Sequence, residues 1–295
     1  MRYAAHETLA APARPSAQLW RLALGVALTA ACFVVVSYSY FNILAGLVAP
    51  GDWPDFAAEI DAGSTPRGMF AVLGVFGLMT LTLALVMNQL HDRSLHSLLG
   101  PVNRAARDFL RVSVALLALA TLLWLLPEPA AMAPQPGLPV LRWLALLPLA
   151  LPLVFIQISA EELAFRGYLQ SQLAARFSNP LIWMAGPAVL FGLLHYDPAT
   201  AGDNASAIAL TAFVFGLAAA DLTARAGTLG PALALHFANN IGALLITAPQ
   251  GLNDGLALQR FPFAIDDLAA RATWLPHDLL TLLCAWLAAR LAIRR

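Results

Sequence analysis

The segment SAEELAFR, residues 159–166, places three ionisable residues inside a stretch that is otherwise apolar enough to span a membrane. An ionised side chain at the centre of a bilayer costs about 2.5–3.5 kcal/mol on membrane-insertion scales. Such residues are retained when they pair with one another, face a wet cavity or take part in chemistry. The segment therefore predicts a membrane-spanning helix with a polar site in it.

The composition extends this membrane interpretation to the whole chain. Of its 295 residues, 60% are hydrophobic and 12% are charged, and the mean hydropathy is +0.71. Soluble domains have about 25% charged residues. The net charge is zero and the arginines are spread among loops, so nucleic-acid binding is not expected. Cys32 and Cys284 both lie in apolar segments, so neither a structural disulfide nor a CxxC metal site is expected.

Runs of about 20 apolar residues cross a bilayer as helices. Eight runs are predicted to do so: 20–48, 68–90, 110–127, 140–175, 181–197, 206–224, 230–247 and 275–293. The fold class is therefore an all-α, polytopic membrane helical bundle with about eight transmembrane helices. Residues 1–18 are rich in Pro and Ala, and we expect them to form a mobile N-terminal tail.

The charges between the spans predict the orientation of the chain. Arginines gather in the N-terminal tail, in residues 93–111 and at the C-terminus, whereas the intervening connections are acidic. The positive-inside rule then puts both termini in the cytoplasm. The lysine-free composition, rich in Ala, Leu and Arg, favours a bacterial inner membrane. Residues 91–109 repeat apolar side chains every three or four positions among arginines, which predicts an interfacial helix that serves as a connector.

The charged residues of the fourth span divide into a pair and a single residue. Glu162 and Arg166 have i, i+4 spacing with the acid first, the favourable order for a helical ion pair. Glu161 lies about 100° around the helix and faces something else. An alternative remains open, in which both glutamates only bind Arg166 and their helix neighbours.

Two later spans add polar residues at four-residue spacing. Phe191 and His195 share a face of the fifth span, and His236 and Asn240 share a face of the seventh, whereas Asn239 projects elsewhere. Taken singly, His195 fits an interfacial residue, and His236 and Asn240 fit helix–helix hydrogen bonds worth about 0.6 kcal/mol each. Together with the glutamates they provide a base to activate water and donors for an oxyanion. This combination is typical of a hydrolase site.

Other protease chemistries lack their motifs in this sequence. There is no HExxH zinc motif, no GxSxG nucleophile elbow and no pair of intramembrane aspartates. In order and residue type, EExxxR at 161–166, FxxxH at 191–195 and HxxxN at 236–240 resemble the three motifs of the CPBP family. This is the family of CAAX proteases and bacteriocin-processing intramembrane endopeptidases, also called Abi.

The resemblance implies an eight-helix bundle with an intramembrane cavity. It covers about residues 140–247, the predicted catalytic core. N-terminal membrane helices over 19–139 precede this core, and a loop with the C-terminal membrane helix, 248–295, follows it.

The resemblance also implies a role for each motif residue. Glu161 and His195 would hold and deprotonate the attacking water, and His236 and Asn240 would form the oxyanion hole. Three further residues would brace the site or pack beside it: Glu162, Arg166 and Phe191.

The predicted function is endopeptidase cleavage of a membrane-associated or lipidated peptide or protein, with this substrate and the lipid bilayer as partners. The alternative is a non-catalytic scaffold or immunity protein that binds peptides in the same cavity. We expect glutamate-dependent hydrolysis without a cofactor. Zinc remains the alternative, because Glu161, His195 and His236 are chemically plausible ligands.

Overall fold

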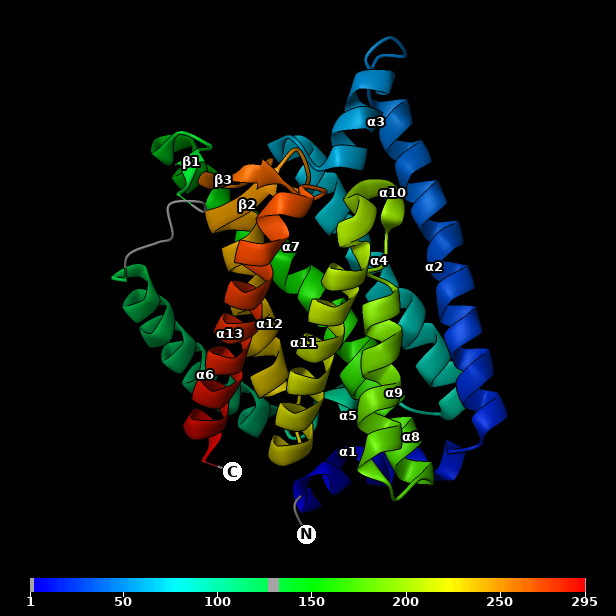
Figure 1. The fold of residues 1–295 in the computed structure, drawn as a ribbon. Helices are drawn as coiled ribbons and strands as arrows, with labels where there is room; N and C mark the ends of the chain where they lie inside the picture. The colour runs from blue at the N-terminus through cyan, green and yellow to red at the C-terminus, as the bar shows by residue number, and fades with distance from the viewer. Residues whose placement is uncertain (1–2, 127–132, 295) are drawn as a thin grey trace.

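The computed structural model of the protein describes residues 3–126 and 133–294. Almost all of it is helical, and the long helices pack into one bundle with the two chain ends near the same side (Figure 1). The bounds of the longer helices are α2 Leu19–Leu47, α3 Trp53–Ala62, α4 Pro66–His91, α6 Val102–Trp124, α7 Val140–Glu162, α9 Pro180–Leu193, α11 Ala205–Ala226, α12 Gly230–Asn240 and α13 Leu268–Ile293. The predicted all-α membrane bundle is confirmed.

The predicted spans fall on these helices. Within the described residues, five helices are long and apolar enough to cross a membrane: Leu19–Leu47, Pro66–His91, Val140–Arg176, Pro198–Ala226 and Leu268–Ile293. Two shorter apolar helices are Pro180–Leu193 and Gly230–Ile246. The remaining predicted span is α6, whose first ten residues carry four charges. These helices account for all eight predicted segments.

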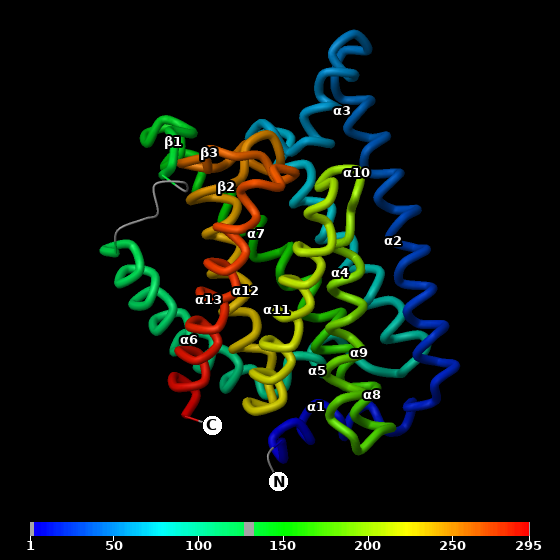
Figure 2. Tube along the Cα trace, viewed as in Figure 1, coloured from blue at the N-terminus to red at the C-terminus, as the bar shows by residue number. Residues whose placement is uncertain are grey.

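Large apolar side chains cover the outside of the bundle. Val34 on α2, Leu141 on α7 and Leu291 on α13 are 66%, 82% and 77% exposed. In water such a surface would be unfavourable, whereas in a bilayer it faces lipid tails. The long outer helices are easiest to follow in the tube view (Figure 2).

Small residues set the close packing between α9 and α11. A Cβ on Gly216 would lie 3.0 Å from Ala188, and a Cβ on Gly192 would lie 2.8 Å from the carbonyl oxygen of Ala209. The sequence contains a small-residue face at positions 216, 220 and 224 of α11. Such faces let membrane helices approach until their backbones are nearly in contact.

The segment 91–109 is not a single interfacial helix, so this prediction is wrong. α4 ends at His91, a short helix α5 (His96–Leu99) follows, and α6 already begins at Val102. Gly100 has a φ of +74° and precedes Pro101, a combination that stops α5 and starts a new helix. Leu98 is completely buried, so this connector packs into the bundle.

The N-terminal segment is also ordered, contrary to the expected mobile tail. It forms three short helical turns: η1 Ala4–His6, α1 Glu7–Ala10 and η2 Ala11–Ser16. Leu9 and Ala13 are fully buried, and the ring of His6 stacks on Trp183 at 4.9 Å. Burial lowers the pKa of His6 to about 4. These buried side chains attach the N-terminal stretch to the bundle.

The end of the bundle opposite the termini carries a small sheet (Figure 1). Its strands are β1 Gln135–Pro136, β2 Thr247–Gln250 and β3 Gln259–Ala264, in the order β1-β3-β2. β3 pairs antiparallel with β1 and parallel with β2. The short helices α10 (Pro198–Ala201) and η5 (Gly202–Asn204) lead from α9 into α11.

Candidate active site

Two of the helices that carry the predicted site change their winding next to its polar residues. The α-helical part of α7 ends at Glu162, and the chain continues as the π-helix η4 (Leu163–Leu169) and then as α8 (Gln170–Arg176). α12 ends at Asn240 and continues as the π-helix η6 (Ile241–Ile246). π-helical turns are rare and occur frequently at functional sites.

Glu162 is the buried centre of the polar cluster. Its Oε1 accepts hydrogen bonds from Arg166 Nη1 and from His236 Nδ1, both at 2.8 Å, and its side chain is 0% exposed. The ion pair predicted from the i, i+4 spacing is therefore present. His236 of α12 joins it, so one carboxylate oxygen ties α7 to α12. Charge-assisted hydrogen bonds of this kind offset part of the cost of burying the carboxylate.

Aromatic rings surround the guanidinium of Arg166, which is 1% exposed. Its Cζ lies 4.6 Å from the ring centroid of Phe191, 5.7 Å from that of Phe215 and 5.8 Å from that of Phe165. Ring faces attract cations, most strongly where water is excluded. A Cβ on Gly216 would come within 3.4 Å of Nη2, so the glycine leaves room for the guanidinium.

His236 lies between the two glutamates. Its Nδ1 faces Glu162, and its Nε2 lies 3.5 Å from Glu161 Oε2. The side chain of Glu161 is 13% exposed, whereas that of Glu162 is not exposed at all. Glu161 is therefore the carboxylate that faces the accessible side of the cluster.

Gln157, which the sequence analysis missed, connects Glu161 to Asn240. Its Nε2 donates to Glu161 Oε1 at 2.6 Å, and its Oε1 accepts from Asn240 Nδ2 at 2.7 Å. The opposite amide orientation would point a carbonyl oxygen at a carboxylate, so the network fixes this one. The available signal was a glutamine in an apolar span, one helical turn before Glu161.

His195 lies in the turn after α9. Its Nδ1 donates to the carbonyl oxygen of Phe191 at 2.8 Å, which leaves Nε2 as the acceptor of a neutral ring. Its ring centroid lies 4.6 Å from that of Phe191, which in turn lies 6.2 Å from that of His236. Within the described residues, no hydrogen bond joins His195 to Glu161.

The predicted residues thus fall into a hydrogen-bonded cluster and a neighbour. The cluster joins residues of α7, η4 and α12: Gln157, Glu161, Glu162, Arg166, His236 and Asn240. His195 contacts it through the ring of Phe191. Asn239 is exposed and donates to Asn240 Oδ1 at 3.1 Å.

Glu161, His195 and His236, the alternative zinc ligands, are not grouped as a metal site within the described residues. Over residues 3–126 and 133–294, no group of three or more His, Cys, Asp or Glu side chains is placed to hold a metal. Of the alternative ligands, His195 and His236 each pack against the ring of Phe191. A catalytic zinc site needs three protein ligands converging on one point.

A second buried ion pair lies in the last turns of α11. Arg225 Nε bonds to Asp221 Oδ2 at 2.8 Å. Tyr3 donates to Asp221 Oδ1 at 2.8 Å, and Trp286 Nε1 donates to Oδ2 at 3.1 Å. This pair connects the N-terminal segment and α13 to α11.

A bundle of apolar helices around a buried polar cluster defines an integral membrane protein with its site among the helices. Residues 142–242 match the model of a family described as type II CAAX prenyl endopeptidase Rce1-like. The match agrees with the resemblance to the CPBP family over this segment, which contains the whole cluster.

One curated relative and the solved structures complete these comparisons. The uncharacterized protein YyaK of Bacillus subtilis (strain 168) is 36% identical over 100 residues, which are 34% of this chain and 33% of the relative. The chain thus matches about a third of the length of this relative. No solved structure matches the chain.

Proposed function

We propose that the protein is a glutamate-dependent intramembrane endopeptidase that cleaves a peptide bond of a membrane-associated or lipidated peptide or protein. One observation carries the proposal. Glu161 is a partly exposed carboxylate with one oxygen fixed by Gln157 and the other beside His236. It lies in the segment that matches a protease family.

Glu161 and His195 would activate the attacking water. Oε1 of Glu161 is occupied by Gln157, so Oε2 is the oxygen that accepts a proton from water. His195 is exposed beside Phe191, and its Nε2 is an acceptor because Nδ1 donates to the backbone. Two acceptors would hold the water, and Glu161 would take its proton as the oxygen attacks the carbonyl carbon.

His236 and Asn240 would stabilise the oxyanion that forms. Asn240 uses one Nδ2 proton for Gln157 and keeps the other for the substrate. Nδ1 of His236 donates to Glu162, so a second donor at Nε2 requires the imidazolium form. In that form the cations Arg166 and His236 balance the two glutamates. Removal of one such donor typically lowers kcat by about 10²–10³-fold.

Glu162, Arg166 and Phe191 would hold these groups in position. Glu162 fixes the ring of His236, and Arg166 neutralises Glu162. Phe191 packs against Arg166 and both histidines. The proposed setting is a bacterial inner membrane with both termini in the cytoplasm and the bilayer as the surrounding partner.

The direct test is cleavage by detergent-purified protein of a quenched fluorescent peptide library. The library includes peptides ending in a CAAX sequence with and without a prenyl group. Glu161→Gln keeps the shape of the side chain but removes the base, and we expect a loss of at least about 10²-fold. Glu59→Gln is the matched control, because Glu59 pairs with Arg67 at the outer end of the bundle; it should cleave like wild type.

Equal rates for wild type and Glu161→Gln would contradict the proposal and indicate a contaminating protease. Binding of peptides without cleavage would favour the scaffold alternative. A parallel reaction with chelator addresses zinc. We expect unchanged activity, and a loss that added zinc restores would instead make Glu161, His195 and His236 ligands.

A further inference from the structure

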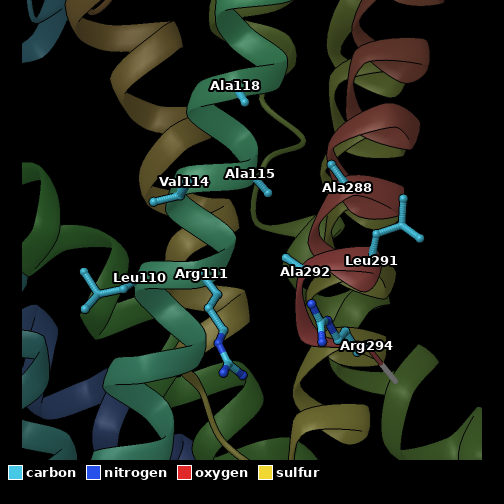
Figure 3. Close-up of a pocket in the computed structure, with 9 residues that line it drawn as sticks. All are labelled: Leu110, Arg111, Val114, Ala115, Ala118, Ala288, Leu291, Ala292 and Arg294. Carbon is cyan, nitrogen blue, oxygen red and sulfur yellow. The ribbon is translucent and has the colours of Figure 1, made fainter.

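A groove of about 780 Å³ runs between α6 and α13 on the outside of the bundle (Figure 3). α6 leans away from the other helices toward its C-terminal end (Figure 1). Small side chains on the facing sides of the two helices leave the space open: Ala115, Ala118, Ala288 and Ala292. The groove is therefore an apolar channel that faces lipid.

Two arginines are the charged residues that line this groove. Arg111 of α6 and Arg294 of α13 lie toward the same end of it (Figure 3). None of the ion pairs within residues 3–126 and 133–294 includes either of them. In that part of the chain, two exposed guanidiniums thus share one end of an apolar groove, and no ion pair neutralises them.

We propose that this groove binds one anionic phospholipid, with an acyl chain between α6 and α13 and the phosphate against Arg111 and Arg294. The planar guanidinium matches phosphate oxygens with paired hydrogen bonds. Basic pockets between membrane helices bind anionic headgroups in this way. The site is separate from the polar cluster and does not depend on the proposed protease activity.

The charge pattern favours a lipid over a partner helix. An apolar helix would fill the groove but would offer the two guanidiniums no negative charge to bind. A lipid with net negative charge satisfies both parts of the groove at once. A zwitterionic lipid fills the channel but leaves the pair of arginines only partly neutralised.

The test measures which lipids stay bound to the full-length protein. Protein is equilibrated with equimolar phosphatidylglycerol and phosphatidylethanolamine in mixed micelles, and bound lipids are counted by native mass spectrometry. Each basic residue near the membrane surface contributes about fivefold to the binding of an anionic lipid. The double variant Arg111→Gln/Arg294→Gln should therefore lower the preference for phosphatidylglycerol about thirtyfold. Arg107→Gln/Arg176→Gln is the matched control: both residues are exposed, neither lines the groove, and the change in net charge is the same.

A second variant tests the apolar part without altering charge. Ala118 lines the groove and is exposed, so Ala118→Trp should fold normally and reduce bound phosphatidylglycerol severalfold. Three results would overturn the proposal. These are an unchanged preference in Arg111→Gln/Arg294→Gln, an equal loss in the control, and full binding in Ala118→Trp.

Discussion

Two carboxylate–arginine pairs with the same i, i+4 spacing are buried in the bundle. They differ in the other side chains that bond to the carboxylate. Glu162 and Arg166 have side chains 0% and 2% exposed, and their third partner is His236, a predicted catalytic residue. The pair is closed off from water by aromatic rings. Its position couples two helices of the proposed active site.

The other pair, Asp221 and Arg225, has side chains 9% and 8% exposed. Its partners are Tyr3 of the N-terminal segment and Trp286 of α13. The i, i+4 spacing therefore determines that a pair forms, while the side chains around it determine what the pair does. One pair serves the site and the other fastens the end of the chain.

The largest expected difference is in stability. Arg166→Ala leaves the carboxylate of Glu162 buried with half of its compensation lost, and breaking such a pair typically costs about 3–5 kcal/mol. Arg225→Ala should cost less, about 1–3 kcal/mol, because Tyr3 and Trp286 still donate to Asp221. Unfolding in mixed SDS micelles, followed by circular dichroism, measures both. An equal or larger loss in Arg225→Ala would contradict the comparison.

Gln157 belongs to the proposed active site, so its substitution should change catalysis and not only stability. Gln157→Leu removes both hydrogen bonds that orient Glu161 and Asn240, and we expect kcat to fall by about 10²-fold with little change in KM, because a small misplacement of catalytic groups has an effect of that size. The measurement is cleavage of the best peptide found for wild type.

Gln172→Leu is the matched control for this prediction. Gln172 is a buried glutamine that donates to His91 Nδ1 at 2.9 Å near the N-terminal segment. It should lose similar stability but keep kcat. If both variants lose activity equally, Gln157 acts only through folding.

Asp221→Asn tests the second pair with a smaller change. The substitution removes the charge that holds Arg225 and Tyr3, and we expect the N-terminal segment to detach more easily by about 1–2 kcal/mol. Hydrogen exchange of residues 4–16 should become about tenfold faster, while cleavage stays within twofold of wild type. Unchanged exchange would mean that apolar contacts alone hold the segment.

Local patterns in the sequence predicted the features that are set within a single helix. The apolar runs predicted the helical segments, and within the described residues five of them are long and apolar enough to cross a bilayer. The spacing of Glu162 and Arg166 gave the ion pair, because neighbours on one helix face meet whatever else surrounds them.

Features that depend on two distant segments were not predictable in the same way. The function of Gln157 as a link requires Asn240, 83 residues further along the chain. The π-helices after Glu162 and Asn240 have no local sequence signal that we recognise. The N-terminal segment is rich in Pro and Ala, and its order rests on a few side chains such as Leu9 whose partners lie elsewhere in the chain.

The smallest expected effect is a pH dependence confined to the N-terminal segment. Burial lowers the pKa of His6 from 6.5 to about 4, so the detached segment binds a proton more readily than the packed one. The neutral form of His6 therefore stabilises the packing of the N-terminal segment fully above about pH 7, and this stabilisation is lost as the pH falls toward 4. At pH 5.5 the loss is about 1.4 kcal/mol, a tenfold increase in the detached population. Hydrogen exchange of residues 4–16, corrected for intrinsic rates, measures it.

His6→Phe provides the control, because it retains an aromatic ring against Trp183 but cannot take up a proton. In that variant the exchange of the N-terminal segment should be independent of pH between 7 and 5, while the Glu162–Arg166 region exchanges slowly in both proteins. A pH dependence that persists in His6→Phe would assign the titration to another group. If acid also speeds hydrogen exchange in the active-site helices, the N-terminal segment and the active site do not open independently.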